Sequence, residues 1–246
     1  MICISVTATT QQKALRDIQK CLNVCDLLEL RMDLIADGNL RDLLEYIENA
    51  LPGRPVVITH RKTKPSSKVN AKAAWPLRQE DNNADDERWA VLQEAVRLGV
   101  AYVDVELEDE DVRVDALRTL IQKHGHYTKL ICSHHDFQKT PALPALKKLY
   151  RACADKGADL IKIVPYAGKI EDNIRVLQFL IWAREQKREV VAFCMGDKGR
   201  LSRVAAPLFG AAFTFAALDE KSAAAPGQIV AKDMMKIFEI LNRKEA

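Results

Sequence analysis

The chain repeats one unit along nearly its whole length, a short apolar run followed by an amphipathic stretch with helical periodicity. The expected strands lie near 2–6, 27–32, 56–60, 102–107, 129–133, 159–164, 190–195 and 211–216. The expected helices lie near 11–21, 39–50, 85–98, 111–123, 143–156, 170–186, 201–208 and 226–241. Alternating strands and helices predict a parallel sheet, and eight such repeats without a linker predict a single (β/α)8 TIM barrel over residues 1–246.

Composition and charge narrow the class of protein. With 246 residues, of which 48% are hydrophobic and 29% charged, the chain can bury one large core. Its net charge of +3 fits a partner that is a small anion better than nucleic acid. No apolar run approaches the roughly 18 residues of a membrane span, and the first residues read directly as a strand without a basic leader. We therefore expect a cytoplasmic protein.

Cysteine usage points the same way. The six cysteines are scattered, with no CxxC pair and no clustered histidines: Cys3, Cys21, Cys25, Cys132, Cys153 and Cys194. Such spacing is typical of reduced core residues and not of zinc ligands or disulfides.

One irregular stretch, residues 62–84, interrupts the repeat. It carries several lysines followed by Glu80 and Asp81. A segment this long without a helical or strand pattern is usually a lid or a disordered connection. It either closes over an anionic ligand or is a solvated loop, and the sequence leaves both readings open.

Lys162 stands within the apolar run 158–164, which is short and β-branched enough to be a buried strand. Burial disfavours an ammonium ion and can lower a lysine pKa by roughly 3–5 units, so such a lysine can serve as a nucleophilic amine. The alternative is structural. In that case the lysine reaches out of the strand end or pairs with Asp104, Glu106 or Asp159.

Polar residues close most of the expected strands, where barrels of this kind carry their active sites. They include Glu29, Arg31, Asp33, His60, Arg61, Asp104, Glu106, Ser133, His134, His135, Asp136, Ser202, Arg203 and Gln228. Of two adjacent histidines in an extended segment, one faces inward. Together with Lys162, these residues predict a cavity for an anionic, hydroxylated carbonyl compound.

Several ordered motifs resemble one family. They are E-x-R-x-D at 29–33, T-x-R at 59–61, Y-x-D-x-E-L at 102–107, S-x-H-D-F at 133–137 and A-P-G-Q at 225–228. In this order, and over nearly the whole chain, they are similar to the type I 3-dehydroquinate dehydratases, the Schiff-base enzymes of the shikimate pathway. Lys162 falls at the spacing of that family's imine-forming lysine.

The resemblance implies a reaction and two catalytic residues. Lys162 would form an imine with the C3 ketone of 3-dehydroquinate, which withdraws electrons from the neighbouring C2–H bond. His135 would take the C2 proton and later act as a general acid on the C1 hydroxyl. Because the imine is the electron sink, neither a metal nor another cofactor is expected. The implied partners are the substrate and a second copy in a homodimer.

The resemblance also implies binding roles. Arg203, helped by Gln228, would bind the substrate carboxylate, because a guanidinium fork matches a carboxylate with two parallel hydrogen bonds. Glu29 and Arg61 would hold the ring hydroxyls, with Arg31 orienting Glu29. The remaining candidates have lesser roles: Ser5 in binding, Asp104 and Glu106 in support, and Met195 and Phe215 as an apolar wall or ordinary barrel packing.

Two departures from the family pattern stand out. Where the family has a glutamate and two glycines after the T-x-R arginine, this chain has 65–67 as Pro-Ser-Ser, so Glu80 or Asp81 would have to fold back to supply a carboxylate. Ala224 stands where the family has a serine, and Ser222 comes two residues too early. These departures keep two alternatives open: a different imine-forming lyase or aldolase, and a non-catalytic barrel that binds a small anion. Aromatic biosynthesis and quinate breakdown use the same dehydration, so the sequence does not separate them.

Overall fold

The computed structural model describes residues 1–62, 82–125 and 127–243, and of residues 82–84 it describes the backbone only. Eight parallel strands pair side by side in the order β7-β6-β5-β4-β3-β2-β1-β8. They are β1 (Ile2–Val6), β2 (Leu27–Arg31), β3 (Val56–Thr59), β4 (Tyr102–Glu106), β5 (Lys129–Asp136), β6 (Leu160–Pro165), β7 (Glu189–Ala192) and β8 (Thr214–Ala216). The sheet curls into a nearly closed barrel, so the predicted (β/α)8 fold is confirmed.

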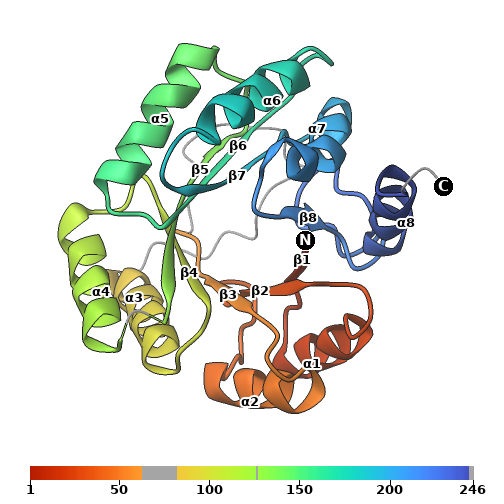
Figure 1. Ribbon diagram of the computed structural model, residues 1–246. Helices are drawn as coiled ribbons and strands as arrows, with labels where there is room; N and C mark the ends of the chain where they lie inside the picture. Colours follow the sequence, from red (N-terminus) through yellow and green to blue (C-terminus); the bar gives the residue numbers. More distant parts are fainter. Residues whose placement is uncertain (63–81, 126, 244–246) are drawn as a thin grey trace.

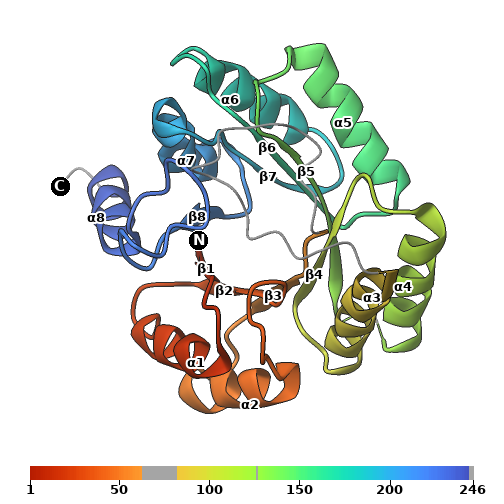
Figure 2. The same cartoon turned by 180° about the vertical axis from the view of Figure 1, so that it is seen from behind.

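Helices follow the strands and lie on the outside of the barrel in both opposite views (Figures 1 and 2). They are α1 (Gln11–Lys20), α2 (Leu40–Ala50), α3 (Asn82–Arg97), α4 (Asp111–Lys123), α5 (Leu143–Asp155), α6 (Asp172–Ala183), α7 (Arg200–Ala205) and α8 (Ala231–Leu241). Two 3-10 helices, η1 (Asp197–Gly199) and η2 (Ala206–Phe209), flank α7. The apolar faces of the helices therefore pack against the outer face of the strands.

The barrel closes between β7 and the segment that leads into β8. There the Ala212 amide donates a hydrogen bond of 2.8 Å to the Val190 carbonyl. On the other side of β8, Ile4 of β1 pairs with Ala216. The two ends of the sheet thus meet through β8, which is the shortest of these strands.

Three predicted boundaries near the last two repeats were wrong. The expected strand 190–195 ends at Ala192, the expected strand 211–216 begins at Thr214, and the expected helix 226–241 begins at Ala231. Gly196 and Gly227 explain part of this difference, because their φ angles of 86° and 78° break regular strand and helix geometry. The loop residues 193–195 and Phe213 are as buried as strand residues, which accounts for their apolar composition.

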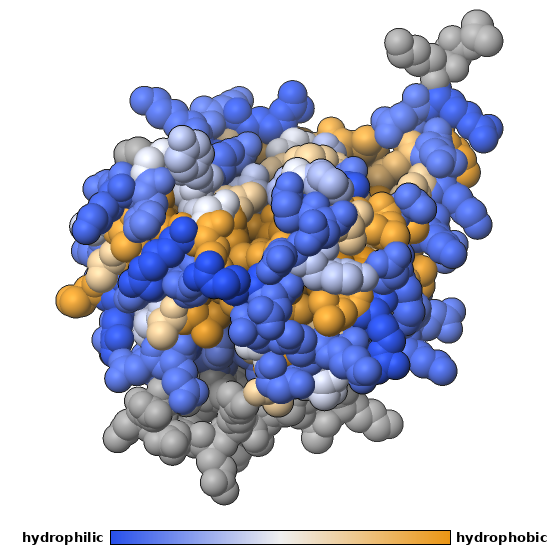
Figure 3. Space-filling view, turned by 90° about the horizontal axis from the view of Figure 1, so that it is seen from below, coloured by the Kyte–Doolittle hydropathy of each residue, from blue (hydrophilic) through white to orange (hydrophobic). Residues whose placement is uncertain are grey.

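The residues inside and around the strands form one core. Every residue of β1, β2 and β3 is buried, and the six cysteines are free and buried, as predicted. The face drawn in Figure 3 carries mostly hydrophilic side chains with apolar patches between them. Among the described residues, no helix is both long and apolar enough to cross a membrane.

Most of the predicted irregular stretch 62–84 lies outside the described residues. Lys62 precedes the gap, and α3 begins after it, at Asn82. The interpretation of residues 62–84 as a lid, and the proposed replacement of the family glutamate by Glu80 or Asp81, concern residues 63–81 and stay predictions. The region of 65–67 lies in the same undescribed part.

Candidate functional site

Lys162 lies inside the barrel in the middle of β6, and its side chain is almost fully buried, with 4% of the residue exposed. Its Nζ atom is 3.0 Å from Asp104 Oδ2 and 3.3 Å from Glu29 Oε1. It also lies 4.4 Å from the centroid of the Phe215 ring. The pairing with Asp104 that the sequence left as a structural alternative is therefore present, and it places the amine at the centre of the predicted polar cluster.

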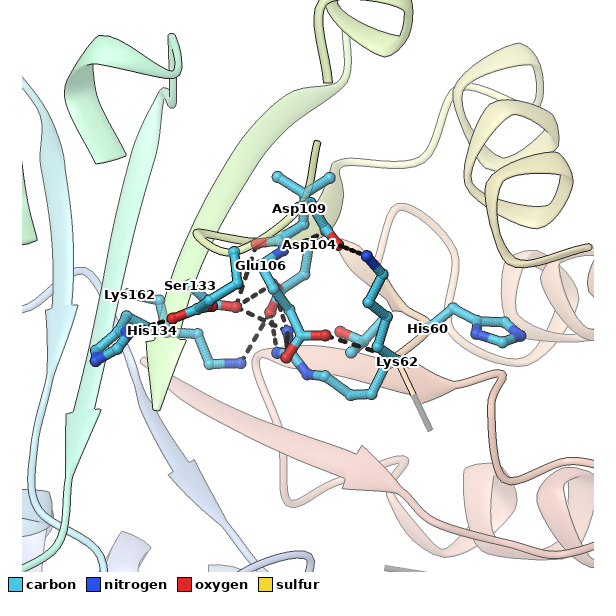
Figure 4. A network of polar contacts seen from close by, with 12 residues as sticks. His60, Lys62, Asp104, Glu106, Asp109, Ser133, His134 and Lys162 are labelled. Carbon is cyan, nitrogen blue, oxygen red and sulfur yellow. Dashed lines mark hydrogen bonds and ion pairs between the residues drawn. The ribbon is translucent and has the colours of Figure 1, made fainter. Parts of the chain in front are cut away.

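Asp104, on β4, is the most heavily bonded carboxylate of this cluster (Figure 4). Its Oδ1 and Oδ2 atoms accept hydrogen bonds of 3.1 and 2.7 Å from the two terminal nitrogens of Arg61. Ser133 donates to Oδ1 at 2.6 Å and accepts from Arg61 at 2.7 Å. Burial alone would raise the pKa of Asp104, but the charges of Arg61 and Lys162 outweigh it and lower that pKa.

Glu29, on β2, is the second carboxylate beside the amine. Ser5 donates a hydrogen bond of 2.5 Å to Oε2, and Thr59 donates one of 2.9 Å to Oε1. Burial acts to raise the pKa of Glu29, yet Lys162 and Arg31 lower it below the ordinary glutamate value. Glu29 is consequently an ionised acceptor at neutral pH.

The two adjacent histidines differ in their surroundings. The Nδ1 atom of His134 lies 2.6 Å from Glu108 Oε1, and Figure 4 shows it at the edge of the cluster. The His135 ring instead stacks on Phe137 with centroids 6.2 Å apart. Burial lowers the pKa of His135 well below its usual value, and the charges of Arg61 and Lys162 add to this effect. A neutral His135 imidazole can accept a proton at pH 7.

Arg31, which the resemblance implied as a partner of Glu29, makes a two-pronged contact with Asp33. Its Nε and Nη2 atoms donate hydrogen bonds of 2.8 and 2.5 Å to the two oxygens of that carboxylate. Its charge still acts on Glu29, where it helps to lower the pKa. Glu106 lies at the far side of the cluster, with Oε1 3.8 Å from Arg61.

Arg203 forms a separate part of the candidate site. It is 1% exposed, and its guanidinium lies 4.6 Å from the centroid of the Phe193 ring. Its Nη2 atom donates a 3.3 Å hydrogen bond to the Pro226 carbonyl, whereas its Nε atom is buried with no hydrogen-bond partner in the described part of the chain. Burial lowers the pKa of Arg203 to about 10. No ion pair within the described residues neutralises this cation.

The segment from β8 to α8 carries Gln228 and contacts Arg203. The Gln228 side-chain oxygen accepts a 2.7 Å hydrogen bond from the Ala224 amide, which fixes the loop on itself. Ser222 is held in a turn with Asp219, to which its amide and its hydroxyl both donate. A cavity of about 720 Å³ opens beside this loop and is bordered by Arg31, Phe137 and Gln228.

The structure thus brings most of the predicted residues into one network around Lys162: Ser5, Glu29, Arg61, Asp104 and Phe215, with Glu106 at its edge and charge coupling to His135. Arg203, on α7, donates a hydrogen bond to Pro226 of the loop that carries Gln228, and Met195 is buried in the segment before Gly196. Within the described residues, no group of three or more His, Cys, Asp or Glu is arranged to hold a metal ion.

Sequence reasoning gave no role to Thr59 and Ser133, which donate directly to the two central carboxylates. A signal was present in both cases. Ser133 lies two residues before His135 in β5, where period-two alternation places both on one face, and Thr59 ends β3 as part of the T-x-R motif.

Comparisons with known proteins agree with this site. A family model described as Type I 3-dehydroquinase matches residues 2–245. A 3-dehydroquinate dehydratase of Syntrophobacter fumaroxidans is 34% identical over 219 residues, covering 87% of this chain and 86% of that protein. One from Desulfotalea psychrophila is 31% identical over 237 residues and 96% of each chain.

Among solved structures, the 3-dehydroquinate dehydratase of Geobacillus kaustophilus is 27% identical. It superposes with a TM-score of 0.83 over 98% of this chain and 90% of that chain. The match in sequence runs from the first strand to the last helix, and the match in fold covers the same length. By its fold, its polar cluster around a buried lysine and its nearly full-length relatives, the chain belongs to the type I 3-dehydroquinase family.

Proposed function

We propose that Lys162 and His135 are the residues with which this member of the type I 3-dehydroquinase family dehydrates 3-dehydroquinate to 3-dehydroshikimate. The observation that carries the assignment is the placement of the Lys162 amine, buried inside the barrel within 3.3 Å of two carboxylates. A buried lysine amine held between two carboxylates is positioned to attack a ketone bound inside the barrel. The site also offers an imidazole and cations for an anionic substrate.

In the proposed reaction, the Lys162 nitrogen adds to the C3 carbonyl carbon, and loss of water gives a protonated imine. The imine draws electrons from the C2–H bond, so His135 can remove the C2 proton as a general base. His135 then returns a proton to the C1 hydroxyl, which leaves as water. Hydrolysis of the imine releases the conjugated ketone and restores Lys162.

The neutral state of His135 supports its role as the base. Burial and the charges of Arg61 and Lys162 keep its pKa low, so the imidazole is ready to accept a proton at neutral pH. Once it holds that proton, the same surroundings favour its transfer to the leaving hydroxyl. One residue can therefore serve as base and then as acid.

The proposed substrate contacts start from Arg203, the buried cation without an ion pair within the described residues. Arg203 would bind the substrate carboxylate, because it is a buried cation whose Nε–H lacks an acceptor. Gln228 would add a neutral donor from the loop that Arg203 contacts at Pro226. Glu29 and Arg61 would hold the ring hydroxyls as acceptor and donor, with Ser5 bonded to Glu29.

Supporting roles go to the residues around this set. Asp104 and Glu106 would hold Arg61 in place through their charges. Phe215, against the Lys162 amine, and the buried Met195 would wall the ring of the substrate. Arg31 would act on Glu29 through its charge while Asp33 holds its guanidinium.

Trapping with borohydride tests the imine. The protein is incubated with 3-dehydroquinate, reduced and digested, and the peptides are mapped by mass spectrometry. Because reduction converts the imine into a stable secondary amine, a ligand-sized mass increase is expected on the peptide that contains Lys162.

The controls are Lys162→Ala, which should give no adduct, and Lys169→Ala, which removes an exposed lysine from the segment after β6 and should leave the adduct unchanged. His135→Ala should still form the adduct but lose turnover. An adduct on another lysine, or none with a folded protein, would overturn the assignment of Lys162.

Family membership supports the dehydratase over a different imine-forming lyase or aldolase, while a non-catalytic barrel that binds a small anion would fail the trapping experiment. The homodimer and the cytoplasmic location stay predictions. Size-exclusion chromatography with light scattering tests the first, and a mass near 55 kDa, about twice the 27.6 kDa of one chain, is expected.

A further inference from the structure

Arg61 lies on a backbone segment that has already left the sheet. β3 ends at Thr59, whose carbonyl accepts the last hydrogen bond in this ladder, from the Met32 amide. The guanidinium of Arg61 must nevertheless reach both Asp104 and Ser133. Because no strand partner restrains residues 60–62, something else has to hold their backbone.

A buried ion pair between α3 and the turn that follows β4 meets this segment. Arg88 is 1% exposed and Asp109 is 3% exposed. The Nη2 atom of Arg88 donates a hydrogen bond of 2.5 Å to Asp109 Oδ2, and its Nε atom donates one of 2.7 Å to the His60 carbonyl. One guanidinium thus donates hydrogen bonds both to a carboxylate and to the carbonyl of the peptide group that precedes Arg61.

The contacts continue to the other side of Arg61. Asp109 Oδ2 also accepts a 2.8 Å hydrogen bond from the Glu106 amide, and Glu106 Oε2 accepts one of 3.1 Å from the Lys62 amide. Lys62 Nζ in turn lies 3.7 Å from Asp109 Oδ1. Figure 4 shows Asp109, Glu106 and Lys62 within the same network of contacts as Asp104. The backbone is therefore tied on both sides of Arg61 to the same buried pair.

We propose that Arg88, through Asp109, is a positioning residue that holds the segment 60–62 so that Arg61 reaches Asp104, Ser133 and the substrate. This inference deepens the proposed function and rests on the binding role of Arg61. Arg88 itself does not touch the reacting atoms. Its effect on the reaction passes through the position of Arg61.

The conservative variant Arg88→Lys separates positioning from simple charge balance. An ammonium keeps the charge opposite Asp109, but it cannot form the guanidinium fork that reaches Asp109 and His60 at once. We expect kcat/KM to fall by about tenfold, the loss of roughly one charge-assisted hydrogen bond, with most of the change in KM. Arg113→Met is the control, because Arg113 of α4 pairs with Asp86 of α3 in an exposed contact, and its loss should leave kcat/KM unchanged.

A double-mutant cycle then asks whether Arg88 acts through Arg61. Arg61→Met alone is expected to reduce kcat/KM, and Arg88→Lys added to it should cost less than about twofold more, because the residue being positioned is gone. Equal effects of Arg88→Lys with and without Arg61 would overturn the proposal. If Arg61→Met itself left kcat/KM intact, the binding role of Arg61 would fail instead, so the two failures are distinguishable.

The pH profile supplies a readout that a purely structural role would not change. His135 is surrounded by Arg61, Lys162, Asp104 and His134, and the charge of Arg61 helps to keep its pKa low. Displacing Arg61 should move the acid limb of kcat/KM to higher pH in Arg88→Lys but not in Arg113→Met. An unmoved acid limb would contradict the proposal. Should Arg88→Lys fail to fold, Asp109→Asn, which keeps an acceptor for the Glu106 amide, takes its place in the same cycle.

Discussion

At the scale of single residues, Arg203 is a buried cation that forms no ion pair within the described residues. A buried charge is costly unless it is paired, and its Nε–H has no acceptor among the described residues. The contacts with Pro226 and Phe193 offset only part of this cost, since a carbonyl and a ring carry no formal charge. Such a cation is a preformed site for a carboxylate, which would gain the missing hydrogen bonds on binding.

Arg203→Met should therefore separate stability from activity. We expect kcat/KM to fall by about 10- to 100-fold, because charge-assisted hydrogen bonds contribute roughly 1.5–3 kcal/mol. The free energy of unfolding should stay level or rise, since an unpaired charge leaves the interior. Steady-state kinetics and urea unfolding measure the two quantities.

Arg97→Met is the control for this experiment, because it removes an exposed guanidinium of α3 and equalises the change in net charge. It should leave both quantities unchanged. A clear loss of stability in Arg203→Met with full activity would mean that Arg203 is an ordinary structural residue.

At the scale of elements, two loops at the barrel mouth depend on each other. The Gly196 amide donates a 3.0 Å hydrogen bond to the Pro226 carbonyl, the same oxygen that accepts from Arg203. Gly227 has a φ of 78°, and a Cβ atom there would lie 2.1 Å from the Gly196 carbonyl oxygen. The A-P-G-Q segment therefore needs its glycine for close backbone contact as well as for its φ angle.

Gly227→Ala is expected to push the two loops apart. The left-handed conformation alone costs an alanine roughly 1–2 kcal/mol, and the clash with a backbone oxygen cannot be relieved by rotating a side chain. We expect a loss of stability of this size and at least about a tenfold fall in kcat/KM, because Gln228 and the Pro226 carbonyl that accepts from Arg203 move with the loop. Enzyme kinetics and thermal unfolding test both.

Gly53→Ala isolates the backbone part of this effect. Gly53 has a similar φ of 68°, yet nothing lies within 4 Å of its Cβ position. The substitution should cost similar conformational energy while leaving kcat/KM unchanged. If both variants were fully active, the loop contact would not matter for the site.

At the scale of the whole molecule, the buried ionisable groups set the pH range of stability. Burial lowers the pKa of His60 to about 4, although the charge of Asp33 opposes this effect, and the pKa of His135 is lowered too. Below about pH 6.5 these two histidines become protonated in the unfolded chain but stay neutral in the folded state. Stability therefore falls with decreasing pH from about 6.5 towards the folded-state values, before the carboxylates with lowered pKa contribute below about pH 4.5.

His60→Gln should flatten the stability curve between pH 6.5 and 4. The difference between the His60 pKa of about 6.5 in the unfolded chain and about 4 in the folded state lowers the stability at acid pH by at most about 3 kcal/mol. The variant lacks this loss. His135 keeps its own share in both proteins. Urea unfolding at pH 7, 5.5 and 4.5 measures the difference, with His124→Gln, at the exposed end of α4, as the control. Parallel curves for His60→Gln and the parent would contradict the expected role.

Much of this fold could be predicted because its signals are local. Each strand and helix is encoded by the period of its own apolar residues, and the barrel follows from eight such units in succession. Boundaries failed at Ala192, Thr214 and Ala231, where the adjoining loop segments also carry apolar residues. The site was predicted as a set, since polar residues at strand ends converge in a barrel, but Thr59 and Ser133 were left without roles.

The sequence by itself determined the order and type of the elements, the inward-facing strand-end residues and the motifs of the family. Only the tertiary structure decided the partners. Lys162 meets Glu29 across 133 residues of sequence, Arg203 has no charged partner within the described residues, and Arg88 reaches the backbone beside Arg61. Periodicity says which way a side chain faces, whereas the groups it meets depend on closing the barrel, which joins segments that share no local pattern.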